Sequence, residues 1–445
     1  MVLETTPVPV DVRRRRALTH PILTWVVAAV LAVASSLWMW HRLGWPTRGI
    51  AWAEDSGVFL NERLELGAVP SLLHPYSGYL HLVPRIVVDA AVALWPIEDY
   101  AMVVTALSCC VIGIVSVTVF VLARDVVRSA PLRALLAVVP AIAPMGVVEI
   151  AGNTANLHWY LLFLAPWVFA FRPRSWWSSA SMAVAALAIT LTEIQAALFV
   201  PLFLFGFRSR RGVPVLAAAF LGLAAQAATT LQAPRPRTPS DASPLDIAAG
   251  FLAQPVAGSW NGDVREVGVT IVHLGWWVVV VPAVVVLAVL VLGLVRRGGA
   301  SRWMIVALGA APAVLWVAAL RVNAVPSMFA EWNEASFQRF GPYRYAAAAS
   351  MFLLAAVVVA ADVCIGRGRV VLPVLGWVLV ASVVAAGVLN VHAETRRADG
   401  PVWSTQVQRQ GAAVCSADPD GTVRIEASPR PRLWTAEVPC ARLEH

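Results

Sequence analysis

The stretch Pro21–Trp40, PILTWVVAAVLAVASSLWMW, determines the class of fold that this sequence can adopt. About 20 apolar residues in a helix are enough to cross the hydrocarbon core of a bilayer. The run ends in tryptophans and has no small-residue cleavage site, so it predicts a retained membrane span and not a secretory signal. Apolar runs of similar length recur along the 445 residues. The chain is therefore expected to cross a membrane several times.

The composition supports this expectation for the whole chain. Hydrophobic residues make up 59% of the sequence and charged residues 13%, whereas soluble domains are nearer one half apolar and one quarter charged. The net charge of +8 does not indicate nucleic-acid binding, because the basic residues lie in short clusters between apolar runs. The sequence predicts an all-α, polytopic transmembrane helical bundle.

The arginine clusters predict the orientation of the spans. Short cytoplasmic loops are enriched in basic residues, and Arg13–Arg16 precede the first apolar run. The amino terminus is therefore expected inside, with residues 1–19 forming a cytoplasmic tail. The later clusters are Arg124/Arg128/Arg133, Arg172/Arg174, Arg208/Arg210/Arg211, Arg296/Arg297/Arg302 and Arg367/Arg369. If all of them face the cytoplasm, the spans between them must come in pairs.

This constraint divides residues 20–390 into about eleven spans of bilayer-crossing character. The expected spans are 20–40, 99–123, 132–148, 158–171, 177–191, 194–207, 213–231, 267–295, 303–320, 343–365 and 370–390. The expected outer loops are 41–97, 232–266 and 321–342, and a small polar tail, 391–445, also lies outside.

Residues 79–96, YLHLVPRIVVDAAVALWP, allow two interpretations. A twelfth span here would move the cluster Arg124/Arg128/Arg133 to the outside. An amphipathic helix at the outer membrane surface is the favoured interpretation, because the segment also contains Pro84, Arg85 and Asp89.

Two cysteines in the polar tail, Cys415 and Cys440, suggest a disulfide. An extracytoplasmic compartment permits such a bond. Two unpaired thiols are the alternative.

The segment Trp52–Asn61, WAEDSGVFLN, places the acidic pair Glu54 and Asp55 directly after the first span. Carboxylates at a membrane surface are costly to desolvate, so such a pair often marks chemistry or a cation site. The structural alternative is an Asp that caps the following helix.

Further polar and aromatic residues gather at the expected outer ends of the spans. Such residues suit a charged, hydroxyl-rich ligand, because Arg can grip phosphate and aromatic rings can stack on sugars. Interface anchoring and helix-end hydrogen bonds are the structural alternatives. The candidate substrate-binding residues are His74, Tyr76, Tyr79, His81, Arg85, Asn153, Asn156, His158, Glu193, Arg339 and Arg344.

The arrangement of one span, an outer loop with an acidic pair, surface helices and many further spans resembles the GT-C superfamily of integral membrane glycosyltransferases. The motif resemblance covers about residues 50–90, and the architectural resemblance about 20–390. The Arg-rich start and outer tail are also similar to actinobacterial cell-envelope arabinosyl- and mannosyltransferases. Those proteins often have a large terminal carbohydrate-binding domain, and from the short tail such a domain is expected to be absent or minimal here.

The resemblance implies transfer of a sugar from a polyprenyl-phosphate donor to a glycan or glycolipid acceptor, outside the plasma membrane. Asp55 is then expected to act as general base, with Glu54 orienting it. A divalent cation, Mg²⁺ or Mn²⁺, held by the two carboxylates is left open. The residues expected to stabilise the leaving phosphate are Arg85, Arg339 and Arg344, with His74 and His81 as further candidates.

Two other function classes fit parts of the pattern. An envelope polysaccharide polymerase or ligase also has many spans, but its Arg and His residues typically lie in a large late outer loop. A lipid-linked-sugar transporter or flippase would show internal repeats and charges near mid-membrane. The richest polar loop here is the first, and the spans carry few charges, which favours the glycosyltransferase.

Overall fold

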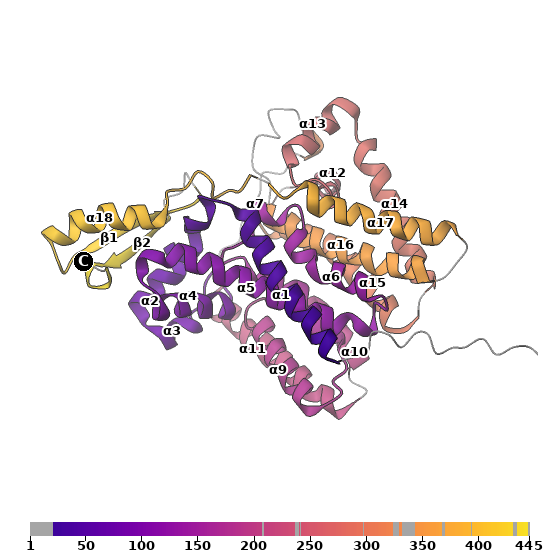
Figure 1. Cartoon of the computed structure of the whole chain (residues 1–445), viewed down its shortest axis with the longest axis horizontal. Helices are drawn as coiled ribbons and strands as arrows, with labels where there is room; N and C mark the ends of the chain where they lie inside the picture. The colour runs from indigo at the N-terminus through magenta and orange to yellow at the C-terminus, as the bar shows by residue number, and fades with distance from the viewer. Residues whose placement is uncertain are drawn as a thin grey trace, which may run out of the picture.

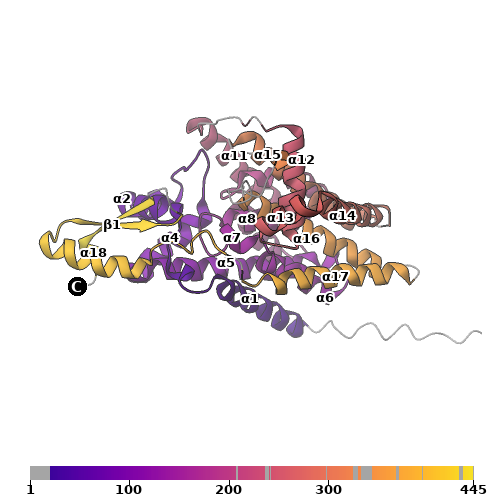
Figure 2. The ribbon, with the colours of Figure 1, turned by 90° about the horizontal axis from the view of Figure 1, so that it is seen from above.

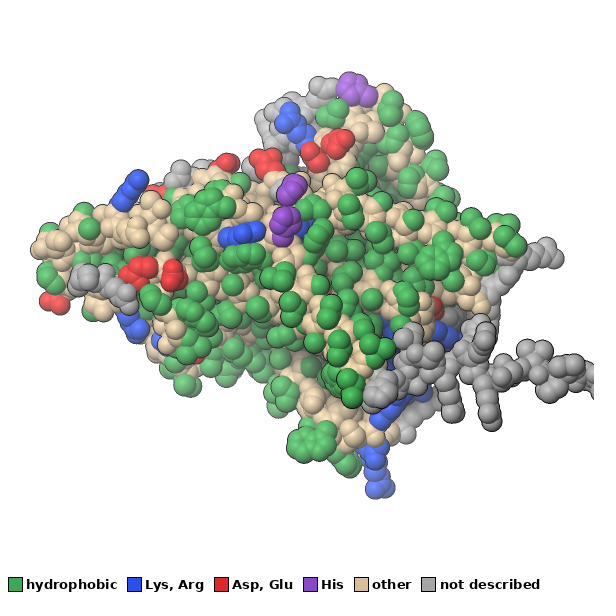
Figure 3. All heavy atoms as spheres, viewed as in Figure 1, with side chains coloured by type: hydrophobic (Ala, Val, Ile, Leu, Met, Phe, Trp, Pro, Cys, Tyr) green, Lys and Arg blue, Asp and Glu red, His purple; other side chains and the backbone are tan. Residues whose placement is uncertain are grey.

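The computed structural model describes residues 21–206, 209–235, 240, 242–296, 298–323, 329–331, 343–366, 370–392, 394–429 and 434–443. Within these ranges, eight helical segments are long and apolar enough to cross a membrane. They are α1 (Pro21–Leu43), α5 (Tyr100–Leu122), α6 (Ala130–Ile142) continued by α7 (Gly146–Glu149), α11 (Val213–Gln232), α14 (Trp277–Arg296), α15 (Gly299–Val322), α16 (Tyr343–Gly366) and α17 (Val371–Leu389). The fold is that of a multi-pass helical membrane protein, and hydrophobic side chains are spread over the face drawn in Figure 3.

Three of the expected spans correspond to shorter helices. They are α8 (Leu157–Ala170), α9 (Trp176–Thr190), and the 3-10 segment η6 (Ile194–Leu202) continued by α10 (Phe203–Gly206). The expected span 267–295 was wrong in its bounds, because α13 (Val264–Leu274) and α14 are separate helices. Gly275 lies between them at φ 89°, a positive value that suits glycine and at which the helix does not continue. A further short helix, α12 (Pro244–Phe251), precedes α13.

The helix α16 forms the centre of the bundle. Almost all of its apolar length is buried among its neighbours, and it contacts α15, α17, α14 and α6. Its alanine-rich sequence lets neighbouring backbones approach closely, as small residues do in membrane helices. The same principle holds between α1 and α5, where a Cβ added at Gly113 would lie 2.5 Å from the carbonyl oxygen of Ala32.

The first expected outer loop is helical and folds back on the bundle. It contains the π-helical turn η3 (Asp55–Leu60) and the helices α2 (Asn61–Leu66), α3 (Ala68–Leu72) and α4 (Leu82–Leu94). At 13 residues, α4 is too short to cross a bilayer. Val88 and Ala91 on one face of α4 are buried, whereas Ile86 and Leu94 are exposed. Segment 79–96 is therefore not a twelfth spanning helix in this structure.

Segments that carry four of the arginine clusters meet at one end of the bundle. Arg174 pairs with Asp125 at 3.0 Å, and Arg211 donates to the carbonyl oxygen of Arg174. The hydroxyl of Ser301, in the first turn of α15, donates to the carbonyl oxygen of Val126 at 3.0 Å. The ends of α5 and α8 and the starts of α11 and α15 therefore lie together, and this region is named the arginine end.

The tail adds a small element of β-structure to the expected all-α fold. It consists of α18 (Trp403–Ala417) and an antiparallel hairpin of β1 (Thr422–Ala427) and β2 (Trp434–Pro439). Burial alternates along β1 because successive side chains of a strand point to opposite faces. The expected disulfide joins Cys415 to Cys440. Figures 1 and 2 both show this tail beside α2 and α4, at the left of the molecule, whereas α14 and α17 lie toward the right.

Candidate functional site

A cavity of about 320 Å³ lies at the end of the bundle opposite the arginine end. This volume is in the range of small-molecule binding sites. It is bounded by the first loop, the start of α8, η6, the end of α15 and the start of α16. The polar and aromatic residues that line it are Glu54, Tyr76, Ser77, Tyr79, His158, Trp159, Glu193, Gln195, Arg235, Asn323, Arg344 and Tyr345. With Arg235, which follows α11, six segments far apart in the sequence contribute to one polar cavity.

Glu54 gives the cavity a carboxylate with free hydrogen-bonding capacity. The side chain is half-buried, and its Oε2 atom has no hydrogen-bond partner among the described residues. Arg344, at the start of α16, interacts electrostatically with Glu54 and lies 5.3 Å over the ring of Tyr345. Burial and the nearby Glu54 together raise the pKa of Tyr76. One wall therefore combines an available acid with a cation.

Glu193 supplies a second carboxylate, which is already paired. Its Oε2 contacts Nδ1 of His158, and its Oε1 accepts from the backbone N–H of Gln195 at 2.7 Å. This second bond caps the start of η6. Glu193 thus has the partners that an acid placed among apolar helices requires, and both Glu193 and His158 face the cavity.

Aromatic rings form much of the remaining wall. The rings of Tyr79 and His81 lie 4.1 Å apart, those of His158 and Trp159 4.2 Å, and those of Trp159 and Tyr345 5.6 Å. His81 is buried behind Tyr79, and this burial, with His158 and Arg85 nearby, holds its pKa well below the usual value. His81 is therefore neutral, and it supports Tyr79 without lining the cavity.

Asp55, the expected base, does not line the cavity. It is 1% exposed, and its carboxylate accepts hydrogen bonds from the Thr154 backbone N–H at 2.9 Å, the Thr154 hydroxyl at 2.7 Å and the Ala155 N–H at 2.8 Å. Burial raises the pKa of Asp55 to about 6, against the lowering effect of these bonds. Its geometry is that of a brace between the first loop and the segment before α8, because its oxygens are already occupied.

Arg397, in the tail, strengthens the same brace. Its guanidinium donates to the carbonyl oxygens of Gly152 at 3.0 Å and Ala151 at 3.1 Å. The side chain is 3% exposed. Burial lowers the pKa of Arg397 to about 10, and the nearby Asp55 opposes that shift. The sequence segment ETRRADG did not distinguish this arginine from any other in the tail.

Several expected site residues have structural roles away from the cavity. His74 is exposed, 3.9 Å from Glu62. Arg85 pairs with Glu62 at 2.5 Å and stacks on Phe59 at 4.8 Å. The side-chain oxygen Oδ1 of Asn153 accepts from the side-chain Nδ2 of Asn156 at 2.8 Å, within their own turn. These residues are not among the lining residues. Arg339 lies outside the described residues.

The cavity also includes residues that the sequence did not single out. Arg235, after α11, and Trp159, after His158, are examples. Arg235 comes shortly after the end of an apolar run, and Trp159 is the last residue of the motif NLHW. No local signal in the sequence indicated that the two residues line the same cavity.

A metal site requires several ligating side chains close together. The described part of the chain has no group of three or more His, Cys, Asp or Glu arranged to hold a metal ion. Glu54 faces the cavity and Asp55 the brace, so the two carboxylates do not form a joint cation site.

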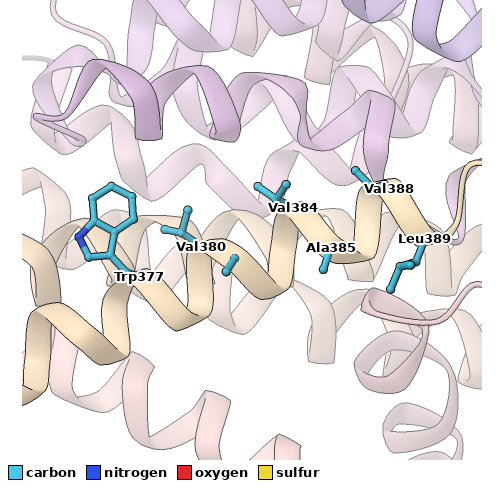
Figure 4. A pocket seen from close by; sticks show the side chains of 7 residues that line it. Trp377, Val380, Val384, Ala385, Val388 and Leu389 are labelled. Carbon is cyan, nitrogen blue, oxygen red and sulfur yellow. The ribbon is translucent and has the colours of Figure 1, made fainter.

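A further groove, of about 490 Å³, runs along α17 and has no polar side chain to offer. It is lined by Trp377, Val380, Ala381, Val384, Ala385, Val388 and Leu389, all on one helix, as Figure 4 shows for the labelled residues. It suits contact with lipid, and its lining has no acidic, basic or nucleophilic side chain that could take part in a reaction.

Comparison with known proteins finds no family model and no curated protein that matches the chain. The function is therefore inferred from the cavity around Glu54 and Arg344.

Proposed function

We propose that the protein is a membrane glycosyltransferase of GT-C type, which moves a sugar from a polyprenyl-phosphate donor to a glycan or glycolipid acceptor on the extracytoplasmic face of the plasma membrane. The observation that carries the proposal is the polar cavity, in which a carboxylate oxygen of Glu54 without a partner among the described residues lies near Arg344. An acid to accept a proton and a cation to bind phosphate are the two groups that this reaction requires.

The orientation rests on two features. Basic clusters favour the cytoplasm, and segments that carry four of them meet at the end of the bundle opposite the cavity. The disulfide between Cys415 and Cys440 suits an oxidising compartment, and the tail packs against the first loop that carries Glu54. Both features favour a cavity that opens outside the cell.

In the proposed mechanism Glu54, and not Asp55, is the general base. Its carboxylate takes the proton of the acceptor hydroxyl as that oxygen attacks the anomeric carbon. The bond between the anomeric carbon and the phosphate oxygen breaks, and polyprenyl phosphate leaves with the bonding electrons. Arg344 and Arg235 stabilise the charge that grows on this phosphate. Asp55 and Arg397 hold the loop that carries Glu54.

The remaining walls suit the other parts of the substrates. Tyr79, Trp159 and Tyr345 offer ring faces and edges for a sugar. The Glu193–His158 pair offers polar atoms for sugar hydroxyls. Because the cavity lies at one end of the bundle, it fits a transferase better than a transporter, whose binding site lies near the midplane.

The test of this function is transfer of radiolabelled sugar. Membranes that contain the protein are given polyprenyl-phosphate mannose or arabinofuranose, and label is followed into membrane glycans and glycolipids. Membranes from a host that lacks the protein are the baseline. Transfer that depends on the protein is expected with one of the donors. Equal labelling with and without the protein would contradict the proposal.

Arg344→Gln should reduce this transfer by about 10–100-fold, because a charge-assisted bond to phosphate contributes about 1.5–3 kcal/mol. The measurement is kcat/KM for the donor. Arg321→Gln is the matched control, since Arg321 is exposed at the end of α15 and does not line the cavity. Equal losses in the two variants would show that Arg344 has no specific role in binding the donor phosphate.

Cys415 and Cys440 should resist a membrane-impermeant maleimide in intact cells until a reductant is added, because both are disulfide-bonded. The measurement is the gel shift of the full chain in a Cys110→Ser background, which removes the one other described cysteine that is exposed. Absence of labelling after reduction, while permeabilised cells become labelled, would place the tail inside.

A further inference from the structure

A second polar cavity, of about 420 Å³, lies at the arginine end. It is enclosed by the end of α5, the end of α8 with the residues that follow it, and the start of α15. Its charged lining residues are Asp125, Arg172 and Arg174. Nothing in the proposed transfer reaction uses this cavity, because it lies at the opposite end of the bundle from Glu54.

The described lining residues include more basic than acidic side chains. Arg172 and Arg174 face one carboxylate, Asp125, which Arg174 approaches to 3.0 Å. A third guanidinium, that of Arg124, lies 5.7 Å over the ring of the lining residue Phe171 and near enough to Arg174 for mutual repulsion. An anion bound here would relieve that repulsion.

The polar groups at this cavity are mostly hydrogen-bond donors. Trp167 lines it and is 1% exposed, and its indole N–H has no hydrogen-bond partner among the described residues. A buried N–H without a partner is uncommon and points to an acceptor that is absent here. Guanidinium and indole groups only donate, so the complementary ligand presents several acceptor oxygens with negative charge. A phosphate ester has this chemistry.

The rest of the lining is apolar and distinguishes between sources of phosphate. Leu122, Ala170, Phe171 and Met304 contribute to the wall, and the cavity lies where apolar helices end. A soluble phosphate would leave this wall without a contact, whereas a lipid places acyl chain and headgroup side by side. We propose that this cavity binds the phosphate headgroup of an anionic membrane lipid.

The test is native mass spectrometry of the purified full-length protein in detergent, with phosphatidylglycerol or phosphatidylcholine added. The wild type should retain phosphatidylglycerol in preference to phosphatidylcholine. The double variant Arg172→Gln/Arg174→Gln should retain it on the order of tenfold less well, because two charge-assisted contacts are lost. Trp167→Phe should show a smaller loss in the same direction.

Arg302→Gln is the matched control, because Arg302 is exposed near the same end but does not line the cavity. It should retain phosphatidylglycerol as the wild type does. Equal retention by the wild type and the double variant would overturn the proposal. Inorganic phosphate is the second probe, and binding of phosphate that needs Arg172 and Arg174 without a preference for phosphatidylglycerol would overturn the lipid as its source. Sugar transfer is measured separately, so failure of either proposal leaves the other standing.

Discussion

Replacement of Glu54 by Gln is expected to lower sugar transfer by about 10²–10⁴-fold, the usual contribution of a general base, while the protein stays folded. Gln keeps the size of the side chain but cannot accept the proton of the acceptor hydroxyl. The folded state should tolerate the change, because the Oε2 atom of Glu54 has no hydrogen-bond partner among the described residues. The measurement is kcat for transfer, with thermal stability in detergent measured on the same preparation.

Glu65→Gln is the matched control, since Glu65 is exposed on α2 and lies outside the cavity. It should transfer sugar at the wild-type rate. Undiminished transfer by Glu54→Gln would remove Glu54 as the base, and Glu193, the other carboxylate in the cavity, would be tested next. A loss of activity together with a loss of stability would assign Glu54 a structural role instead.

Replacement of Arg397 by Met is expected to destabilise the protein by about 3–5 kcal/mol, the range found when one member of a buried charged pair is removed. The guanidinium donates to the carbonyl oxygens of Ala151 and Gly152 and interacts with the buried Asp55. Met fills a similar volume but donates nothing, so these carbonyl groups lose a donor and the Asp55 carboxylate loses a nearby positive charge. The measurement is the free energy of unfolding in detergent with a chemical denaturant.

The same substitution should also reduce transfer, because Glu54 precedes Asp55 in the loop that the brace holds. Arg409→Met, at an exposed position of α18, is the control and should leave stability and transfer unchanged. Wild-type stability of Arg397→Met would show that the brace does not need its cation. Glu54→Gln and Arg397→Met thus differ in one measurable respect: the first should lose activity alone, and the second activity and stability together.

The helical part of the fold was predictable because a bilayer requires long apolar runs. The run Pro21–Trp40 gives α1, and most of the other expected spans correspond to a helix in the structure. The boundary between α13 and α14 was missed, because Gly275 interrupts an otherwise apolar sequence and only its backbone conformation shows the break. The hairpin of the tail was also missed, since two short strands among polar residues give a weak pattern.

The candidate site was predictable only in outline. The sequence indicated the first loop and the polar outer ends of the spans, and Glu54, Tyr76, Tyr79, His158, Glu193 and Arg344 do meet in one cavity. It favoured Asp55 over Glu54 as the base, but the two residues are chemically alike and adjacent, so the sequence could not separate their roles. Successive residues of a helix point about 100° apart, so one of them faces the cavity and the other the brace.

The sequence by itself determined that the chain is a helical membrane protein, because apolar length and charge distribution are local properties that the bilayer selects directly. It also determined that acidic, basic and aromatic residues gather at the ends of the helices. Only the tertiary structure decided which carboxylate has an oxygen without a partner among the described residues, that Arg235 and Trp159 join the cavity, and that Arg397 of the tail braces Asp55. These relations join residues far apart in the chain, and packing of the helices brings them together without a local signal in the sequence.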